Sequence, residues 1–463
     1  MLTLLLALQA PVTPPPASDP RVHAIVSAVS AAHIEADIRH LVAFGTRNTM
    51  SDTLSATRGI GAARRWIKAQ FDSISAACGG CLDVFYVAEE FPAGSGRLRP
   101  DAPTNIVNVV AVQRGSSDPG RYVIMSGDID SRISSGSNAV DSAPGANDNA
   151  SGMAGTIEAA RVLSHYRFNA SIVYLGLSGE EQGLYGGGTV ARYARAHGWN
   201  VEAMLNNDMI GNIAGISGVI DNTTGRVFSD GNPPLTVDLP PNAPDSAVRS
   251  ALRQMERALA IRRVAGSDVD GVSRQLARYV ARIADRYVRN LSMTMVYRLD
   301  RFSRGGHHRP FADMGWPAVR IMETNENYNR QHQDIRDENG IHYGDVIAGV
   351  NFDYARKLTA LNAATLASIA WAPDVPQSVR LGGAVEASAR MAWSAPADTS
   401  TLAGYRVYWR LTDQPQWQWS RWVGRTDHWT FDDLVIDNYF FGVVAVSRDG
   451  TESPVAFPTG LLR

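Results

Sequence analysis

Acidic residues follow apolar runs at three points of this sequence. Asp128 and Asp130 come after RYVIMSG, Glu180 and Glu181 after ASIVYLGLSG, and Asp208 after VEAMLNN. One acidic residue in such a place often only caps a helix or ends a strand. Several carboxylates on one rim would repel each other and raise each other's pKa unless a cation relieved the repulsion. If the fold brings them together, the pattern predicts a metal site.

The elements that would position these residues alternate between strands and helices. Apolar and β-branched runs predict strands at 82–91, 104–113, 121–127, 170–179, 201–211, 293–299 and 316–323. Helical spacing predicts helices within 21–73 and at 149–166, 183–198, 273–288 and 344–371, and residues 214–245 read as a surface excursion. This alternation predicts an α/β fold with a mainly parallel mixed sheet flanked by helices. Ligands of such sheets bind beyond the carboxyl ends of the strands, where the acidic residues would converge.

Three further features refine the expected chemistry. Asp148 stands in the loop PGANDNASG, just before the helix expected at 149–166, and joins the same rim. Neighbouring side chains point in different directions, so one of Glu180 and Glu181 can bind a metal while the other stays free as a base. The segment GGHHRPF offers His307 and His308, and imidazole nitrogen suits zinc.

Between about residues 35 and 370 the chain resembles the secreted zinc aminopeptidases of metallopeptidase family twenty-eight, whose fold also serves glutaminyl cyclases. The resemblance is carried by FGTRNTMS, SGDIDSR, APGANDNASG, LSGEEQGLYGG, LNNDMIGN, RFSRGGHHRPF and METNENYNRQHQ. It implies a hydrolase that removes N-terminal residues from peptides. It also implies two divalent metal ions as cofactors, with zinc as the expected metal.

The resemblance implies a role for each matching residue. Asp148 would bridge the two ions and Asp208 would bind the first of them. Glu181 and His308 would bind the second ion. Glu180 would be the general base, which takes a proton from the attacking water and returns it to the leaving amine.

The sequence departs from the family at two positions that look reciprocal. The family has His-x-Asp where this chain has Asp128 and Asp130, and close relatives have aspartate where it has His307. Asp128 could bind the first ion through oxygen, His307 could supply the missing imidazole, or the first position could be empty. We favour oxygen ligation by Asp128, which zinc accepts and which would shift the preference toward manganese or cobalt. In that case Asp130 cannot orient Asp128, because one carboxylate cannot orient another without a proton or a water molecule between them.

The polar segment ETNENYNRQHQ follows the last expected strand. In the resembled family this region lies near the substrate. The resemblance therefore implies that Glu323, Tyr328 and His332 contact the amino end of the substrate or the tetrahedral intermediate. A loop held by its own hydrogen bonds is the structural alternative.

Composition narrows the range of partners. The chain has 44 Lys and Arg against 46 Asp and Glu, a formal net charge of −2. This balance opposes a nucleic-acid or polybasic membrane surface. No run reaches the roughly 20 apolar residues that span a bilayer. We therefore expect no nucleic acid and no membrane span. The resemblance implies peptide substrates, and the oligomeric state stays open.

The two ends of the chain differ from its middle. Residues 1–20 combine an apolar run with a Pro-rich stretch, which is typical of a signal peptide and predicts a secreted or periplasmic protein. The catalytic domain would then span residues 21–372. The motif ACGGCL contains the only two cysteines, Cys78 and Cys81, for which a small-loop disulfide and a pair of free thiols are both open.

After APDVPQ the composition turns to Trp, Tyr and Val at alternating spacing. Residues 373–463 therefore predict a small β-sandwich, which resembles a fibronectin type III domain with Trp393 as its buried tryptophan.

Two other functions compete with the aminopeptidase. A glutaminyl cyclase-like acyltransferase would use a single zinc ion, and an inactive relative would only bind peptides. The intact Glu180–Glu181 pair argues against an inactive protein, whereas the altered Asp128 argues for one.

Overall fold

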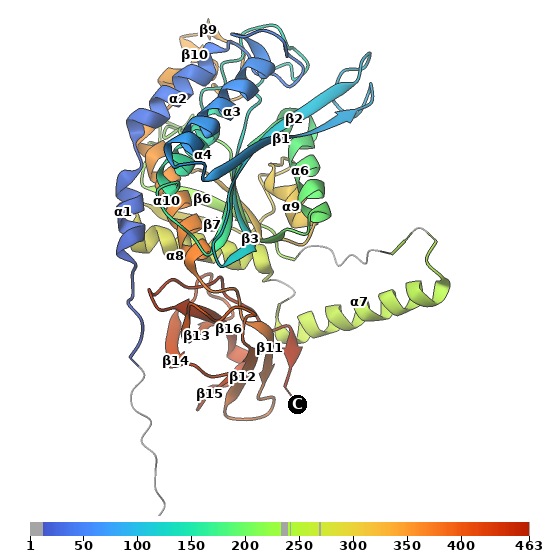
Figure 1. Ribbon diagram of the computed structural model, residues 1–463, viewed down its shortest axis with the longest axis vertical. Helices are drawn as coiled ribbons and strands as arrows, with labels where there is room; N and C mark the ends of the chain where they lie inside the picture. The colour runs from blue at the N-terminus through green and yellow to red at the C-terminus, as the bar shows by residue number, and fades with distance from the viewer. Residues whose placement is uncertain (1–12, 233–238, 241, 268–269, 463) are drawn as a thin grey trace, which may run out of the picture. The chain divides into compact units, whose positions relative to one another are not determined.

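Figure 1 shows the computed structural model of the chain, which describes residues 13–232, 239–240, 242–267 and 270–462. The first 12 residues of the predicted signal-like segment lie outside this description. The chain divides into two compact units. The larger comprises residues 20–252 and 268–371, and the smaller comprises residues 1–19, 253–267 and 372–463. The division at residue 372 lies beside the boundary expected from APDVPQ.

An eight-stranded mixed sheet forms the centre of the larger unit, as the sequence predicted. Its strands, in spatial order, are β1 (Leu82–Phe91), β2 (Thr104–Gln113), β4 (Ala170–Leu177), β3 (Asp118–Asp128), β5 (Asn200–Asn207), β8 (Ala318–Glu323), β6 (Thr224–Ser229) and β7 (Ser292–Val296). Strands β4, β3, β5 and β8 are parallel neighbours, so their carboxyl ends share one edge. β1 and β2 extend the sheet antiparallel to β4.

Helices cover both faces of this sheet (Figure 1). One face carries α1 (Pro20–Ala28), α2 (Ala31–Ala43), α3 (Gly59–Ala77), α4 (Ala150–Leu163), α8 (Val272–Tyr287) and α10 (Phe352–Trp371), and the other carries α6 (Tyr185–Ala196) and α9 (His308–Asp313). Val109 and Ala111 of β2 pack into the core of the first face, and Val110 and Val112 into that of the second. This alternation follows from the two-residue period of a strand. None of the described helices combines the length and apolarity needed to cross a bilayer.

Strand β6 lies within residues 214–245, where the sequence predicted only a surface excursion. The expectation was wrong there because β6 is defined by its pairing with β7 and β8, not by a local alternation. The described part of the chain also contains α7 (Asp245–Ala265), the short helices α5 (Glu180–Gly183), η1 (Ile347–Gly349) and η2 (Ile436–Asn438), and the hairpin β9 (Arg336–Glu338) and β10 (Ile341–Tyr343).

The smaller unit contains two sheets. One has the order β15 (His428–Phe431), β12 (Ala389–Ser394), β11 (Gln377–Gly382) and β17 (Gly460–Leu461), and the other β14 (Trp419–Gly424), β13 (Leu402–Leu411) and β16 (Tyr439–Ser447). Met391 and Phe431 from the first sheet share a core with Val407 and Phe441 from the second. Trp393 is buried in this core, with 4% of its surface exposed. The likeness to fibronectin type III stays a prediction.

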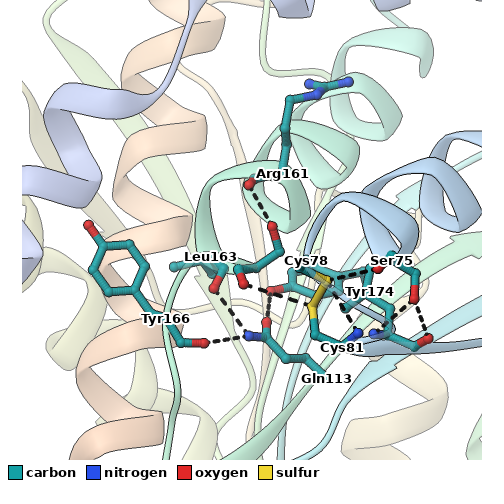
Figure 2. Close-up of a disulfide and its surroundings, with 10 residues drawn as sticks. Ser75, Cys78, Cys81, Gln113, Arg161, Leu163, Tyr166 and Tyr174 are labelled. Atoms are coloured by element: carbon teal, nitrogen blue, oxygen red, sulfur yellow. Dashed lines mark hydrogen bonds between the residues drawn. A yellow bond between two sulfur atoms is a disulfide. The ribbon is translucent and has the colours of Figure 1, made fainter.

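Cys78 and Cys81 are joined by a disulfide directly after α3 (Figure 2). The turn between them is also held by Ser75, whose hydroxyl donates to the Leu82 carbonyl at 2.7 Å and accepts from the Leu82 N–H at 3.2 Å. The disulfide, rather than the pair of free thiols, therefore closes the passage from α3 into β1.

Candidate metal centre and active site

The acidic residues singled out in the sequence converge at the carboxyl edge of β4, β3 and β5. Asp128 is the last residue of β3, and Asp208 directly follows β5. The chain turns sharply after β4 at Gly179, whose φ of +77° favours glycine, and α5 then begins with Glu180. Asp148 precedes α4, which is capped by the Asn149 side chain accepting the Gly152 N–H at 3.0 Å.

Asp148, Glu181 and His332 form a compact group whose ligand atoms all lie within 4.8 Å of one another. His332 Nε2 lies 2.9 Å from Asp148 Oδ2 and 2.9 Å from Glu181 Oε1. Two carboxylates and one imidazole are a zinc ligand set that leaves a fourth position open for water or substrate. The residues present therefore fit a zinc ion.

Arg132 lies beside this group. It donates from Nε to Glu181 Oε2 at 2.7 Å, and its Nη2 lies 2.6 Å from His332 Nδ1. A neutral imidazole that binds zinc through Nε2 carries its proton on Nδ1. The contact between Arg132 and His332 would have to open when zinc binds.

Zinc affinity at this group should depend steeply on pH. Burial alone would lower the pKa of His332, but the charges and hydrogen bonds of Glu181 and Asp148 outweigh burial and raise it to about 9. Below that pH the imidazole holds a proton that zinc must displace, so we expect affinity to rise about tenfold per pH unit from pH 6 to 8 and to level off near 9. Competition with a chelating dye at fixed ionic strength measures this. A flat profile would contradict the role of His332.

Asp130 positions the segment that carries Glu180 and Glu181. Its carboxylate accepts the backbone N–H of Glu180 at 3.2 Å and of Glu181 at 3.1 Å. It also accepts the hydroxyl of Thr49 at 2.9 Å. Asp130 therefore anchors the start of α5. This role was not predicted from the sequence.

Glu180 lines the cleft above the metal group. Within the described chain, no side-chain hydrogen bond or ion pair involves its carboxylate, in contrast to Glu181. Burial and the nearby charges of Asp208, Glu181 and Asp128 hold the pKa of Glu180 well above its usual range. A carboxyl group that no protein group holds by a hydrogen bond and whose pKa is raised is suited to accept and return a proton.

The residues at the expected first-ion position are already paired within the protein. Asp128 shares a 2.5 Å hydrogen bond with His307 Nδ1 and accepts from Asn149 Nδ2 at 2.7 Å. Asp208 Oδ2 lies 2.8 Å from the buried guanidinium of Arg320. The two positions at which the sequence departs from the family, Asp128 and His307, are thus in direct contact. Asp128 and Asp208 offer oxygen ligands, and His307 offers only Nε2 because its Nδ1 is bonded to Asp128. With the fixed cation of Arg320 beside Asp208, these residues do not fit a tight zinc site as they stand.

His308 does not reach the metal group. Its Nε2 donates to the Leu299 carbonyl at 2.6 Å, and its ring lies 3.9 Å from Asp300. It is fully buried at the start of α9. The resemblance implied that His308 binds a metal ion, but the structure does not bring His308 to the metal group. The histidine that meets Asp148 and Glu181 is His332.

Two of the three expected substrate contacts lie elsewhere. Glu323 is buried and accepts from Asn147 Nδ2 at 2.9 Å and from the Asn212 N–H at 2.7 Å, so it braces loops. Tyr328 is 54% exposed and does not line the cleft. The third, His332, belongs to the metal group.

A cleft of about 620 Å³ opens over the metal group. Its floor contains Asp148, Glu180, Glu181, Asp208 and His332, and its walls include Arg97, Arg132, Arg301, Arg304, Arg309 and Leu184. Acidic and basic side chains therefore dominate the lining, which suits a polar substrate such as a peptide.

Two residues that support the site, Asp345 and Arg320, were not predicted from the sequence. Asp345 accepts the backbone N–H groups of Asn147 at 2.9 Å and of Asp148 at 2.7 Å, across almost 200 residues. Arg320 is a basic residue inside the apolar run of β8. This unusual position could have marked Arg320 from the sequence as a buried, paired charge. Asp345 stands in a polar loop, where no local pattern distinguishes it.

Known proteins that resemble this chain in sequence or in fold include peptidases. Residues 108–228 match peptidase family M28. A probable zinc metalloprotease of Leptosphaeria maculans is 38% identical over 444 residues, covering 96% of this chain and 98% of that protein. A probable zinc metalloprotease of Pyrenophora tritici-repentis is 38% identical over 445 residues, covering 96% and 88%. The aminopeptidase LapA of Legionella pneumophila has a similar fold, with a TM-score of 0.52 and 19% identity over 79% of this chain and 78% of that one.

Proposed function

Because the chain belongs to peptidase family M28, a family with zinc metalloproteases among its members, we propose that it is a zinc aminopeptidase that removes N-terminal residues from peptides. The observation that carries the proposal is the group of Asp148, Glu181 and His332, with the unpaired carboxylate of Glu180 beside it in the same cleft. We assign zinc binding to these three residues.

The residues of the chain then divide the work of hydrolysis. Bound zinc would acidify a water molecule and polarise the scissile carbonyl. Glu180 accepts the proton of the attacking water and returns it to the leaving amine. Asp130 holds Glu180 in place through the backbone of α5. The raised pKa of Glu180 favours the first of these transfers, because a carboxylate with a raised pKa is the stronger base.

Preference for a free N-terminus is supported by an unused acceptor in the cleft. Asp208 Oδ1 is buried without a hydrogen-bond partner among the described residues. Such an oxygen is costly to bury unless a cation or donor meets it. In the proposed enzyme, the α-ammonium group of the substrate meets it.

Release of chromophore from aminoacyl p-nitroanilides by zinc-loaded protein tests the aminopeptidase. N-acetylated versions of the same substrates are the matched control, and we expect them to be inert. Cleavage of the acetylated substrates, or of internal bonds in a blocked peptide, would overturn the exopeptidase assignment. Cyclisation of N-terminal glutamine, assayed in parallel, would favour the cyclase-like alternative.

The expectation of two metal ions stays a prediction, and zinc titration tests it. Since Arg320 and His307 already pair with Asp208 and Asp128, we expect one tight equivalent per chain and a second at least about tenfold weaker. The double variant Asp128→His, His307→Asp restores an imidazole and should tighten the second equivalent. Two equally tight equivalents in the unaltered protein, measured by calorimetry with elemental analysis, would contradict this order.

Export to a secreted or periplasmic location remains part of the proposal. It rests on the signal-like sequence at the N-terminus and on the disulfide between Cys78 and Cys81, since disulfides persist in oxidising compartments.

A further inference from the structure

A second pocket, of about 550 Å³, lies beside the active-site cleft but shares none of its lining residues. Its walls come from the loop before α3, from the second turn of α3, and from β1, β2 and the loop that joins them. The lining residues are Thr49, Met50, Ser51, Thr53, Gly61, Arg64, Arg65, Tyr86, Arg99, Pro103, Thr104, Asn105 and Val107. They include three arginines and no carboxylate.

Arg64 is buried, with 5% of its surface exposed, and lacks hydrogen bonds where they are expected. Among the described residues, neither its Nε nor its Nη2 has a partner. Arg47, which is equally buried, shows the usual arrangement, because its guanidinium donates to four backbone carbonyls, two of them those of Ile129 and Gly145. The charge of Asp130 acts on Arg64 but supplies no hydrogen bond. A buried guanidinium without hydrogen bonds is costly, so Arg64 would gain from a ligand where Arg47 would not.

Three further polar groups of this pocket can donate hydrogen bonds. Thr104 Oγ1 is buried without a hydrogen-bond partner among the described residues. Arg65 donates to the Thr53 carbonyl at 2.9 Å, and Arg99 donates to the Met50 carbonyl. Neither of these two arginines forms an ion pair with a carboxylate in the described chain. The pocket therefore presents positive charge and hydroxyl donors to whatever enters it.

The pocket wall is built by close packing rather than by a loose loop. A Cβ on Gly61 would lie 2.1 Å from the Thr53 carbonyl oxygen, so only glycine lets the loop lie directly on α3. Ser51 fixes the same contact, because its hydroxyl accepts the Ile60 N–H at 2.8 Å. The donors are thus held in place before any ligand arrives.

One residue of the pocket also contacts the catalytic machinery. Thr49 lines the pocket, and its hydroxyl donates to Asp130 Oδ2. Asp130 in turn accepts the N–H groups of Glu180 and Glu181. Two hydrogen bonds, from Thr49 to Asp130 and from the Glu180 N–H to Asp130, therefore connect the pocket to the general base.

We propose that the pocket of Arg64, Arg65, Arg99 and Thr104 is an oxyanion-binding site that takes a carboxylate group, and that its occupation adjusts the catalytic segment through Thr49 and Asp130. A carboxylate supplies negative charge and acceptor oxygens to the guanidinium groups that line the pocket. The carboxylate comes either from an acidic residue of the peptide substrate or from a free small anion. Binding does not depend on the proposed peptidase activity, whereas the effect on turnover does.

Thermal unfolding and calorimetry of the zinc-loaded protein with glutarate test the binding step. At constant ionic strength, we expect glutarate to raise Tm with a saturable concentration dependence, and the neutral analogue glutaramide to leave it unchanged. Absence of a glutarate effect on the unaltered protein would overturn the proposal.

Three variants separate this site from a structural role of Arg64. Arg64→Met should lower glutarate affinity at least about tenfold while leaving the Tm in glutarate-free buffer equal or higher, because it removes an unpaired buried charge. Arg99→Gln, at an exposed position, should weaken glutarate binding without risk to folding. Arg309→Met, in the active-site cleft, is the control and should leave glutarate binding unchanged. A normal glutarate response in both Arg64→Met and Arg99→Gln would overturn the proposal.

Kinetics distinguish the two sources of the carboxylate. If the substrate supplies it, Arg64→Met raises KM for peptides with glutamate in place of glutamine and leaves the glutamine peptides unchanged. If a free anion supplies it, glutarate changes kcat on a neutral substrate in the unaltered enzyme but not in Arg64→Met. Glutarate binding without either kinetic effect would overturn the coupling through Asp130.

Discussion

Glu180→Gln should lower kcat by about 10²- to 10⁴-fold while the protein keeps its fold and its zinc. The amide has nearly the same shape as the carboxylate but cannot accept the proton of the attacking water. Zinc is retained because the ligand group of Asp148, Glu181 and His332 does not include Glu180. The measurement is steady-state hydrolysis of an aminoacyl p-nitroanilide, with zinc per chain determined on the same sample.

Glu181→Gln is the matched comparison, because it makes the same chemical change one residue further along. Its carboxylate contacts His332 at 2.9 Å and Arg132 at 2.7 Å, so its loss should release zinc as well as activity. Adding excess zinc should partly restore Glu181→Gln and should not restore Glu180→Gln. Substantial kcat in zinc-loaded Glu180→Gln would remove Glu180 from the role of base.

His332→Ala should abolish high-affinity zinc binding, and with it hydrolysis. The imidazole is the one nitrogen ligand of the group, and two carboxylates alone make a weak zinc site. We expect zinc affinity to fall by at least about 100-fold, beyond the 10–100-fold typical of residues that only support a ligand. Calorimetry or dye competition at pH 8 measures the loss.

His308→Ala tests the alternative histidine and should give the opposite pattern. His308 is buried, and its hydrogen bond to the Leu299 carbonyl would be lost together with its packing. We expect a destabilisation of about 2–4 kcal/mol with zinc affinity unchanged in the folded protein. If His308→Ala loses zinc and His332→Ala keeps it, His308 is the zinc ligand that the resemblance implied and His332 is not.

The general plan of the site could be read from local patterns. Acidic residues after apolar runs predicted the carboxylates at the strand ends, and Asp128, Asp208 and the Glu180–Glu181 pair do lie at the carboxyl edge of the sheet. This works because strand periodicity and turn residues are encoded over a few neighbouring positions. Adjacent parallel strands then bring their ends together.

The choice between the two histidines could not be made in this way. His308 and His332 both follow polar loops, and the resemblance pointed to His308. Only the path of the chain between residues 299 and 345 decides which ring meets Asp148 and Glu181. That path depends on contacts such as the one between Asp345 and the Asp148 backbone, which join residues almost 200 positions apart.

Local sequence patterns were enough to predict the α/β architecture and the sheet edge at which the acidic residues gather. The pairings of charge depend on the folded chain: Arg320 with Asp208, His307 with Asp128, and Arg64 without a hydrogen bond to Nε or Nη2 from any described residue. The physical reason is that hydrophobic periodicity is a local property, whereas the pairing of a buried charge depends on which distant segments fold against it. We propose that these pairings limit how many metal ions are held tightly and where an anion can bind.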